Sequence, residues 1–410
     1  MLKIGIPTIS NGVAGHCRLS ATIECNGVIK PLWFEVDEEY GKYLCAERCD
    51  AFVLAVLQWA MKYGHDIECV APMTDRLYEQ LCGQFLPAFY RANGFRRESF
   101  VSGGGRGYAV KITCPTAPEV EHVDTAAIGT GVSTGVDSLH VFAAHPEITH
   151  ACLWTGEGAN DDAEGQRRTA AWKDSVEHSR KFVDYISKKF IVGRTNFFDS
   201  GCLPKLQWSY YTTFGNLFCI FALQKLWSKY YIASDCGVEH FKLKISLLED
   251  PAHYEFFLFP WVSIGRLAVR MDGADITRAD KVRDLVQYEP AQKFLNTCWG
   301  WDRQKGHTNC SHHCPKCMRT MLTLYGFDAL DKFSAVYDVE YFKRNFHQYL
   351  AEYYRGLIQK DFFIIELRPY LSYRRYPLFV RMWAWFIVLK KSFKKAFRFG
   401  GQSGVFSPEG

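Results

Sequence analysis

From about residue 116 onward, the sequence alternates short apolar runs with longer segments of helical periodicity. Residues 167–189 and 210–227 carry the helical spacing. The short runs around them read DTAAIGTG, THACLWT, KFIVGRTN and KYYIASD, which is typical of buried strands. Because parallel strands need a crossover connection, usually a helix, this alternation predicts an α/β fold with a doubly wound parallel sheet.

The regions on either side have different patterns. Near the N-terminus, Asn26-Gly27 separates two strand-like runs, which predicts a hairpin with a type I′ turn. The apolar residues that follow have helical spacing and end at Gly64. We therefore expect an N-terminal α+β domain over residues 1–115, the α/β domain over 116–330, and a helical tail rich in basic and aromatic residues over 331–410.

Composition and charge narrow the class of protein. A length of 410 residues with 48% hydrophobic residues allows sizeable cores. The formal net charge of +5 is too small for this length to indicate a nucleic-acid partner. The 15 cysteines follow no secretory leader, and no apolar run reaches the roughly 20 residues of a spanning helix. A reducing cytoplasm is therefore the expected location.

One loop carries the first functional indication. The segment GTGVSTGVDSLHVF (residues 129–142) lies between the first predicted strand of the sheet and the next helix. Ligands bind at this edge of such sheets, and the free amides of a helix N-terminus favour an anion such as phosphate. The P-loop pattern fails because Val136 and Asp137 follow Gly135, and the dinucleotide pattern fails at Thr134.

The six residues STGVDS (Ser133, Thr134, Gly135, Val136, Asp137 and Ser138) resemble the S-G-G-x-D-S loop of the PP-loop ATP pyrophosphatases. The resemblance implies that this loop binds ATP, with Ser133, Gly135 and Ser138 contacting pyrophosphate and Asp137 ordering the loop or holding Mg²⁺. Thr134 stands where the family has its first glycine, a costly change if that position needs a positive φ. The alternative is a glycine-rich turn capped by Ser133 or Asp137.

Four cysteines fall within a short stretch further along the chain. Cys298, Cys310, Cys314 and Cys317 end in the spacing C-x3-C-x2-C, and thiolates gathered this closely usually hold a metal. Four thiolates suit tetrahedral Zn²⁺ in a structural site. A 4Fe–4S cluster is the alternative. His312 and His313 lie between the second and third cysteines, and we expect neither to be a ligand.

Together, the loop and the cysteines resemble those of 7-cyano-7-deazaguanine synthases over roughly residues 120–325. The segments DGADITRADK and CSHHCPKCMRTML are more similar to a set of uncharacterised bacterial PP-loop proteins. This resemblance implies that Asp272, Arg278 and Lys281 contact nucleotide or substrate, with the two cations stabilising a leaving pyrophosphate. The alternative is a solvated helix start capped by Asp275 or Thr277.

The C-terminal stretch combines Trp383, Trp385 and Phe386 with Lys390, Lys391, Lys394 and Lys395. Its apolar part is too short to span a membrane but suits a helix that lies at a membrane surface. Packing on the body of the protein and binding of an acidic protein are the alternatives.

The resemblance implies an enzyme, an ATP-dependent ligase that forms C–N bonds. It would adenylate a carboxylate or amide of a small-molecule substrate, release pyrophosphate and admit a nitrogen nucleophile, giving an amide or nitrile. One alternative is sulfur transfer to RNA, with Cys152, Cys202 or Cys236 as the reactive thiol. Another is a non-catalytic nucleotide sensor or scaffold. The sequence does not indicate the substrate or the oligomeric state.

Overall fold

A computed structural model describes residues 1–95, 107–123, 126–156, 163–198, 208–244, 251–298, 308–311, 314–372 and 376–400. The chain forms two compact units. The first comprises Met1–Ser133 and Asp137–Ile276, and the second comprises Thr134–Val136 and Thr277–Gly410. The units therefore divide near residue 277, and residue 115 falls within the first.

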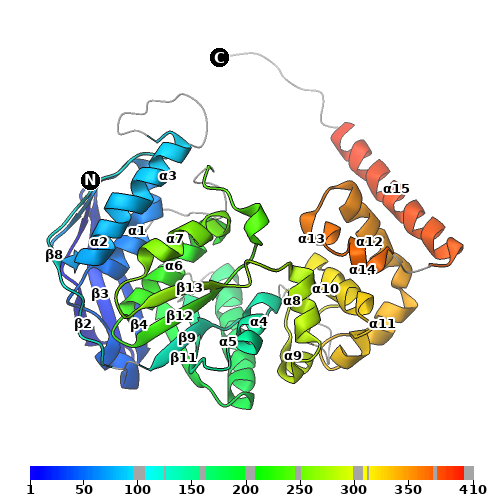
Figure 1. The fold of residues 1–410 in the computed structure, drawn as a ribbon, viewed down its shortest axis with the longest axis horizontal. Coiled ribbons are helices and arrows are strands. Elements are labelled where there is room, and N and C mark those ends of the chain that lie inside the picture. Colours follow the sequence, from blue (N-terminus) through cyan, green and yellow to red (C-terminus); the bar gives the residue numbers. More distant parts are fainter. Residues whose placement is uncertain are drawn as a thin grey trace. The chain divides into compact units, whose positions relative to one another are not determined.

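A sheet of 11 strands, counted over the described residues, forms the centre of the first unit (Figure 1). Its order is β13-β12-β9-β10-β11-β4-β3-β1-β5-β7, with β2 added beside β3. Two further short strands, β6 (Met73–Thr74) and β8 (Thr116–Ala117), pair separately. The strands of the large sheet are β1 (Leu2–Ile4), β2 (Thr8–Asn11), β3 (His16–Cys25), β4 (Val28–Asp37), β5 (Ile67–Cys69), β7 (Ile112–Thr113), β9 (Ala127–Gly131), β10 (His150–Gly156), β11 (Lys189–Thr195), β12 (Trp227–Ala233) and β13 (Ala268–Asp272).

Five neighbouring strands, β11-β10-β9-β12-β13, are all parallel. Numbered along the chain from β9, their order is 3-2-1-4-5, so the chain winds outward on one side of β9 and then crosses to the other. The structure thus confirms the predicted α/β class with a mostly parallel central sheet, and the arrangement is compatible with a doubly wound fold. The loop after β9 lies where the winding reverses.

The N-terminal strands extend this sheet. Asn26 and Gly27 have φ angles of 51° and 78°, and β3 pairs with β4 on either side of them, as expected for the predicted hairpin. Strand β4 then pairs antiparallel with β11, with Glu35 opposite Arg194. Residues on both sides of position 115 therefore share one sheet.

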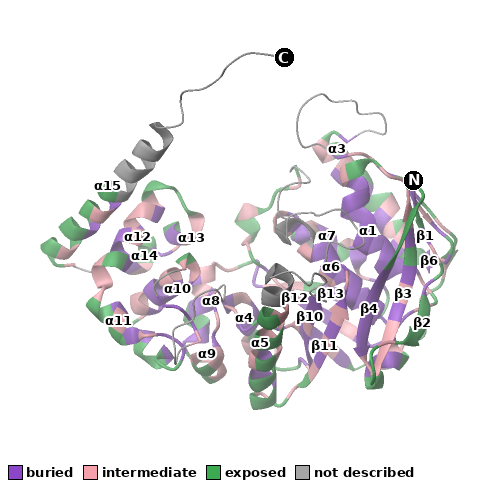
Figure 2. Ribbon diagram, turned by 180° about the vertical axis from the view of Figure 1, so that it is seen from behind, coloured by how far each residue is buried: buried purple, intermediate pink, exposed green. Residues whose placement is uncertain are grey.

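Helices cover both faces of the sheet, with α4 and α5 on one side and α6 on the other (Figure 1), as right-handed crossovers require. Figure 2 shows that α1 is almost entirely buried; its residues 50–61 are all buried. Phe52 on α1 packs against Phe218 on α6, which also meets Phe34 of β4. The helices of this unit are α1 (Asp50–Tyr63), α2 (Asp75–Gln80), α3 (Leu86–Asn93), α4 (Val136–Ala144), α5 (Ala163–Tyr185), α6 (Trp208–Ala222) and α7 (Glu255–Val262).

The second unit is helical in its described residues. Helix α10 packs on α8 and α12, and α12 packs on α15. No helix in the described part of the chain is long and apolar enough to cross a membrane. The helices are α8 (Arg278–Leu285), α9 (Glu289–Phe294), α10 (Pro315–Gly326), α11 (Val339–Arg344), α12 (Phe346–Ile358), α13 (Phe362–Ile365), α14 (Arg368–Leu371) and α15 (Leu378–Gly400).

A buried carboxylate makes the stability of the first unit depend on pH. Asp50, at the start of α1, is fully buried and accepts hydrogen bonds from the amide and hydroxyl of Thr74 at 2.8 and 2.5 Å. Burial raises its pKa from 3.8 to about 6. The carboxyl group of Asp50 therefore binds its proton more tightly in the folded chain than in the unfolded chain. The stability that the protonated carboxyl group contributes is fully present below about pH 4 and is lost as the pH rises through about 6.

We expect Asp50→Asn to remove this dependence. Between pH 4 and pH 7 the unfolding free energy of the variant should rise relative to wild type by up to about 3 kcal/mol. Urea denaturation at several pH values measures this difference, and Asp75→Asn, an exposed position on α2, is the matched control. A difference between wild type and Asp50→Asn that stays constant over this range would contradict the prediction.

Candidate functional site

The loop between β9 and α4 contains the six predicted nucleotide-binding residues. It leaves the carboxyl end of β9, which has parallel neighbours on both sides, β10 and β12. Helix α4 begins at Val136, so Gly135 immediately precedes the helix and Asp137 lies in its first turn. Ser133 is exposed, Gly135 and Asp137 are partly exposed, and Val136 is buried. Helix amides and a carboxylate thus lie at the edge where doubly wound sheets bind ligands.

Ser138 braces this loop from inside. Its hydroxyl donates to the carbonyl of Gly131 at 3.1 Å and accepts from the amide of Ser133 at 3.1 Å. Its side chain is nearly inaccessible. In this conformation, Ser138 therefore closes the turn, and Ser133 is the serine of the motif that faces solvent.

Thr134 has a left-handed backbone conformation, and it stands where the S-G-G-x-D-S pattern has its first glycine. Its φ is 55° and it is fully buried. A β-branched residue in this conformation costs on the order of 1–2 kcal/mol. Within the second unit, its carbonyl accepts a hydrogen bond from the amide of Asn296 at 2.8 Å. Tertiary structure thus holds a conformation that a glycine would adopt more readily.

Two histidines that the sequence analysis did not identify hold α4 against the sheet. His140 Nδ1 and His145 Nε2 lie 3.1 and 2.7 Å from the two carboxylate oxygens of Asp272, at the end of β13. Burial opposes the charge of this carboxylate, but the hydrogen bonds and charges of both histidines outweigh burial and lower the pKa of Asp272. The ring of His145 also stacks on Tyr231 of β12, with ring centroids 3.8 Å apart.

This cluster fixes the helix whose first turn carries Asp137. The available signal in the sequence was local: His140 and His145 follow the loop on the same helix pattern. Asp272, predicted as a nucleotide or substrate contact, is placed by the structure as the partner of these histidines.

Arg278 and Lys281 lie on α8 in the second unit, whereas Asp272 belongs to the first. Thr277 caps this helix by accepting from the amide of Asp280 at 3.1 Å, which agrees with one of the two predicted caps. The guanidinium of Arg278 lies 4.5 Å from the ring centre of Phe363. Lys281 is almost fully buried.

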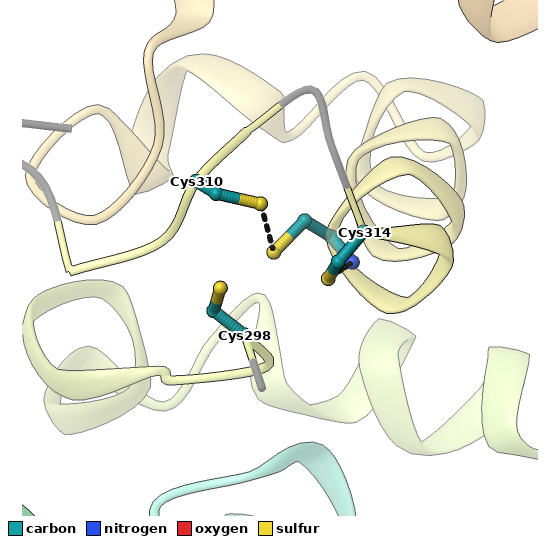
Figure 3. A group of neighbouring side chains, drawn as sticks. Cys298, Cys310 and Cys314 are labelled. Atoms are coloured by element: carbon teal, nitrogen blue, oxygen red, sulfur yellow. Dashed lines mark hydrogen bonds between the residues drawn. The ribbon is translucent and has the colours of Figure 1, made fainter. Parts of the chain in front are cut away.

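The four predicted cysteines come together in the second unit. Figure 3 shows Cys298, Cys310 and Cys314 pointing toward a common centre from separate segments. With Cys317, their sulfur atoms all lie within 4.8 Å of one another, and the cluster could hold a metal ion. Cys310 Sγ and Cys317 Sγ are 3.7 Å apart. The amide of Cys317 donates to Cys314 Sγ at 3.3 Å at the start of α10, an arrangement that favours negative charge on that sulfur.

Asn309 is the scaffold of this cluster. Its fully buried side chain accepts from the amides of Thr297 and Cys298 at 2.8 and 3.0 Å. It donates to the carbonyls of Leu295 and Val336 at 2.8 and 3.1 Å. The side chain therefore ties the segment of Cys298 to that of Cys310. His312 and His313 lie outside the described residues.

Comparison with protein-family models, with curated proteins and with solved structures finds no match to this chain.

Proposed function

We propose that the chain binds ATP at the loop of residues 133–138 and cleaves it between the α- and β-phosphates. The observation that carries this proposal is the place of the loop, at the carboxyl end of β9 where the winding of the sheet reverses. The turn braced by Ser138 and the first amides of α4 support an anion site there. Thr134 has a positive φ and stands at the position of the first glycine in the S-G-G-x-D-S loop that this segment resembles.

The proposed reaction has two steps. A carboxylate or amide oxygen of a small-molecule substrate forms a bond to the α-phosphorus, and the bond to the pyrophosphate oxygen breaks. From an activated carboxylate, a nitrogen nucleophile attacks the acyl carbon, loses a proton and displaces AMP, which gives an amide. From an activated amide, which loses one N–H proton on adenylation, loss of AMP and of the second N–H proton gives a nitrile. Ser133 and the amides near Gly135 would bind the pyrophosphate, and Asp137 would hold Mg²⁺, which prefers oxygen ligands. Arg278 and Lys281 are candidates, by resemblance only, for stabilising the leaving group.

We propose zinc as the metal of the cysteine cluster, with a structural role. Four thiol ligands fit Zn²⁺ and leave no open position for water or substrate. The protein would then be cytoplasmic, since thiolate sites of this kind persist in a reducing compartment.

Sulfur transfer to RNA is less well supported. That chemistry needs a reactive thiolate, which is found in partly exposed, electropositive surroundings. Cys152 is buried in β10, and burial raises its pKa well above that of a free thiol. Cys202 lies outside the described residues, and Cys236 is partly exposed just after β12.

The test is the product formed from ATP. Purified protein should convert ATP to AMP and pyrophosphate when supplied with a pool of small carboxylates and ammonia. Asp137→Ala should lower this activity on the order of 100-fold, whereas Asp184→Asn, an exposed carboxylate on α5, should not. Chromatography of ATP labelled at the α-phosphate separates the outcomes: release of ADP and phosphate would contradict the proposal.

A further inference from the structure

Helix α15 carries a row of large apolar side chains that stay largely exposed among the described residues. Ala384 and Val388 are buried against the second unit, where α15 lies along α12. Trp385 stacks on Tyr354 of α12 at 5.5 Å between ring centroids. Six large apolar side chains of this helix remain 52–72% exposed: Leu378, Phe379, Met382, Trp383, Phe386 and Leu389. Figure 2 shows exposed positions of α15 in green.

The exposed side chains lie on one side of the helix. Residues 378, 382 and 386 are spaced by four, as are 379 and 383, so they form one stripe, opposite the stripe of residues 384 and 388 that packs inward. A contiguous patch of this kind on a soluble domain marks an interaction site rather than a chance exposure of single residues.

The charge around this stripe is strongly one-sided. Between Leu367 and Gly400 the sequence has nine lysines and arginines and no aspartate or glutamate. Four of these lysines follow the stripe directly, at positions 390, 391, 394 and 395. The partner must therefore offer negative charge next to an apolar surface.

We propose that α15 lies flat on an anionic lipid membrane, with its exposed apolar side chains among the acyl chains and its lysines at the headgroups. The exposed stripe runs along a single helix, on the side opposite the residues that pack inward. A helix in this position can lie on a flat bilayer, whereas a protein partner would need a groove that wraps the helix. Trp383 and Phe386 next to lysines are typical of helices at the membrane interface. The helix is not apolar enough to span.

Flotation of the full chain with lipid vesicles tests this proposal. Wild-type protein should float with vesicles that contain about one third phosphatidylglycerol and should bind pure phosphatidylcholine vesicles at least about tenfold more weakly. Phe379→Ser/Met382→Ser/Phe386→Ser should weaken binding to the anionic vesicles by about tenfold or more, although it keeps every lysine. Changing all four lysines to glutamine should weaken it similarly.

Matched controls make the outcome decisive. Val28→Ser/Ile29→Ser removes two exposed apolar side chains from the β3–β4 hairpin of the first unit and should bind like wild type. Circular dichroism checks that each variant is folded. Three results would overturn the proposal: no binding of wild type to anionic vesicles, unchanged binding of the triple variant, or a wild-type dimer that the triple variant converts to a monomer. None of these results depends on ATP, so they leave the proposed function to its own test.

Discussion

Replacing Glu35 by alanine is expected to lower the unfolding free energy of the first unit by about 3–5 kcal/mol. The carboxylate of Glu35 is fully buried. Arg18 contacts one of its oxygens at 2.8 and 2.9 Å, and Arg194 contacts the other at 3.3 Å. Alanine would leave two guanidinium groups facing each other across the site without their shared anion.

The position of Glu35 enlarges the effect. Arg18 lies on β3 and Arg194 on β11, so the three side chains join the N-terminal strands to the parallel part of the sheet at the β4–β11 pair. Chemical denaturation measures the loss, and Glu38→Ala, an exposed glutamate just after β4, serves as the control. A loss below about 1 kcal/mol, as for a surface ion pair, would contradict this account.

Replacing Cys310 by serine is expected to abolish the metal binding that we propose for the four cysteines and to unfold the region around the cluster. A structural zinc site couples metal binding to folding, and apparent binding energies reach about 10–16 kcal/mol in small zinc domains. Cys310 is buried, and its sulfur lies against that of Cys317, so loss of this ligand opens the site. We expect a fall in melting temperature of about 10 °C or more.

Metal analysis and thermal unfolding, measured on the same sample, test this expectation. Hydrogen exchange should increase first in residues 289–298 and 315–326, which contain Cys298 and Cys317. Cys82→Ser, a partly exposed thiol of the first unit, should keep both the metal and the stability. A Cys310→Ser protein with one bound metal and wild-type melting would rule out the four-cysteine site.

A metal bound at the four cysteines is also expected to stabilise the loop of residues 133–138. Asn296, whose amide holds the carbonyl of Thr134, directly precedes Thr297 and Cys298, which Asn309 binds. Metal release should therefore weaken ATP binding together with stability.

Local signals in the sequence predicted the elements that depend on local physics. Asn26-Gly27 predicted a hairpin because both residues tolerate the positive φ of a type I′ turn. The end of α1 was predictable because Gly64 adopts the left-handed cap conformation. The parallel strands were predictable from the alternation of apolar runs and helices.

Long-range pairing was not predictable in the same way. The β4–β11 pair joins Glu35 to Arg194, and no local pattern near either residue indicates the other. Strand β13 was missed because its five residues include Arg270 and Asp272, which break the apolar run. The expected boundary at residue 115 followed from the change of pattern there, although both patterns contribute to one sheet.

In the candidate sites, too, local patterns were predictable and long-range contacts were not. The residue type and the spacing of the four cysteines predicted the metal site, and their sulfur atoms lie together in the structure. Asn309 was missed because an amide that bonds four backbone groups has no spacing rule. His140 and His145 were missed because their partner, Asp272, is more than a hundred residues away.

Binding of ATP to the purified, metal-loaded protein tests the central claim most directly. Isothermal titration with ATP and magnesium should show one saturable site per chain, and Asp137→Ala should bind at least about tenfold more weakly. The account predicts this result whether or not the true substrate is present. Folded wild-type protein that binds no ATP at millimolar concentration would contradict the assignment of residues 133–138 as a nucleotide site.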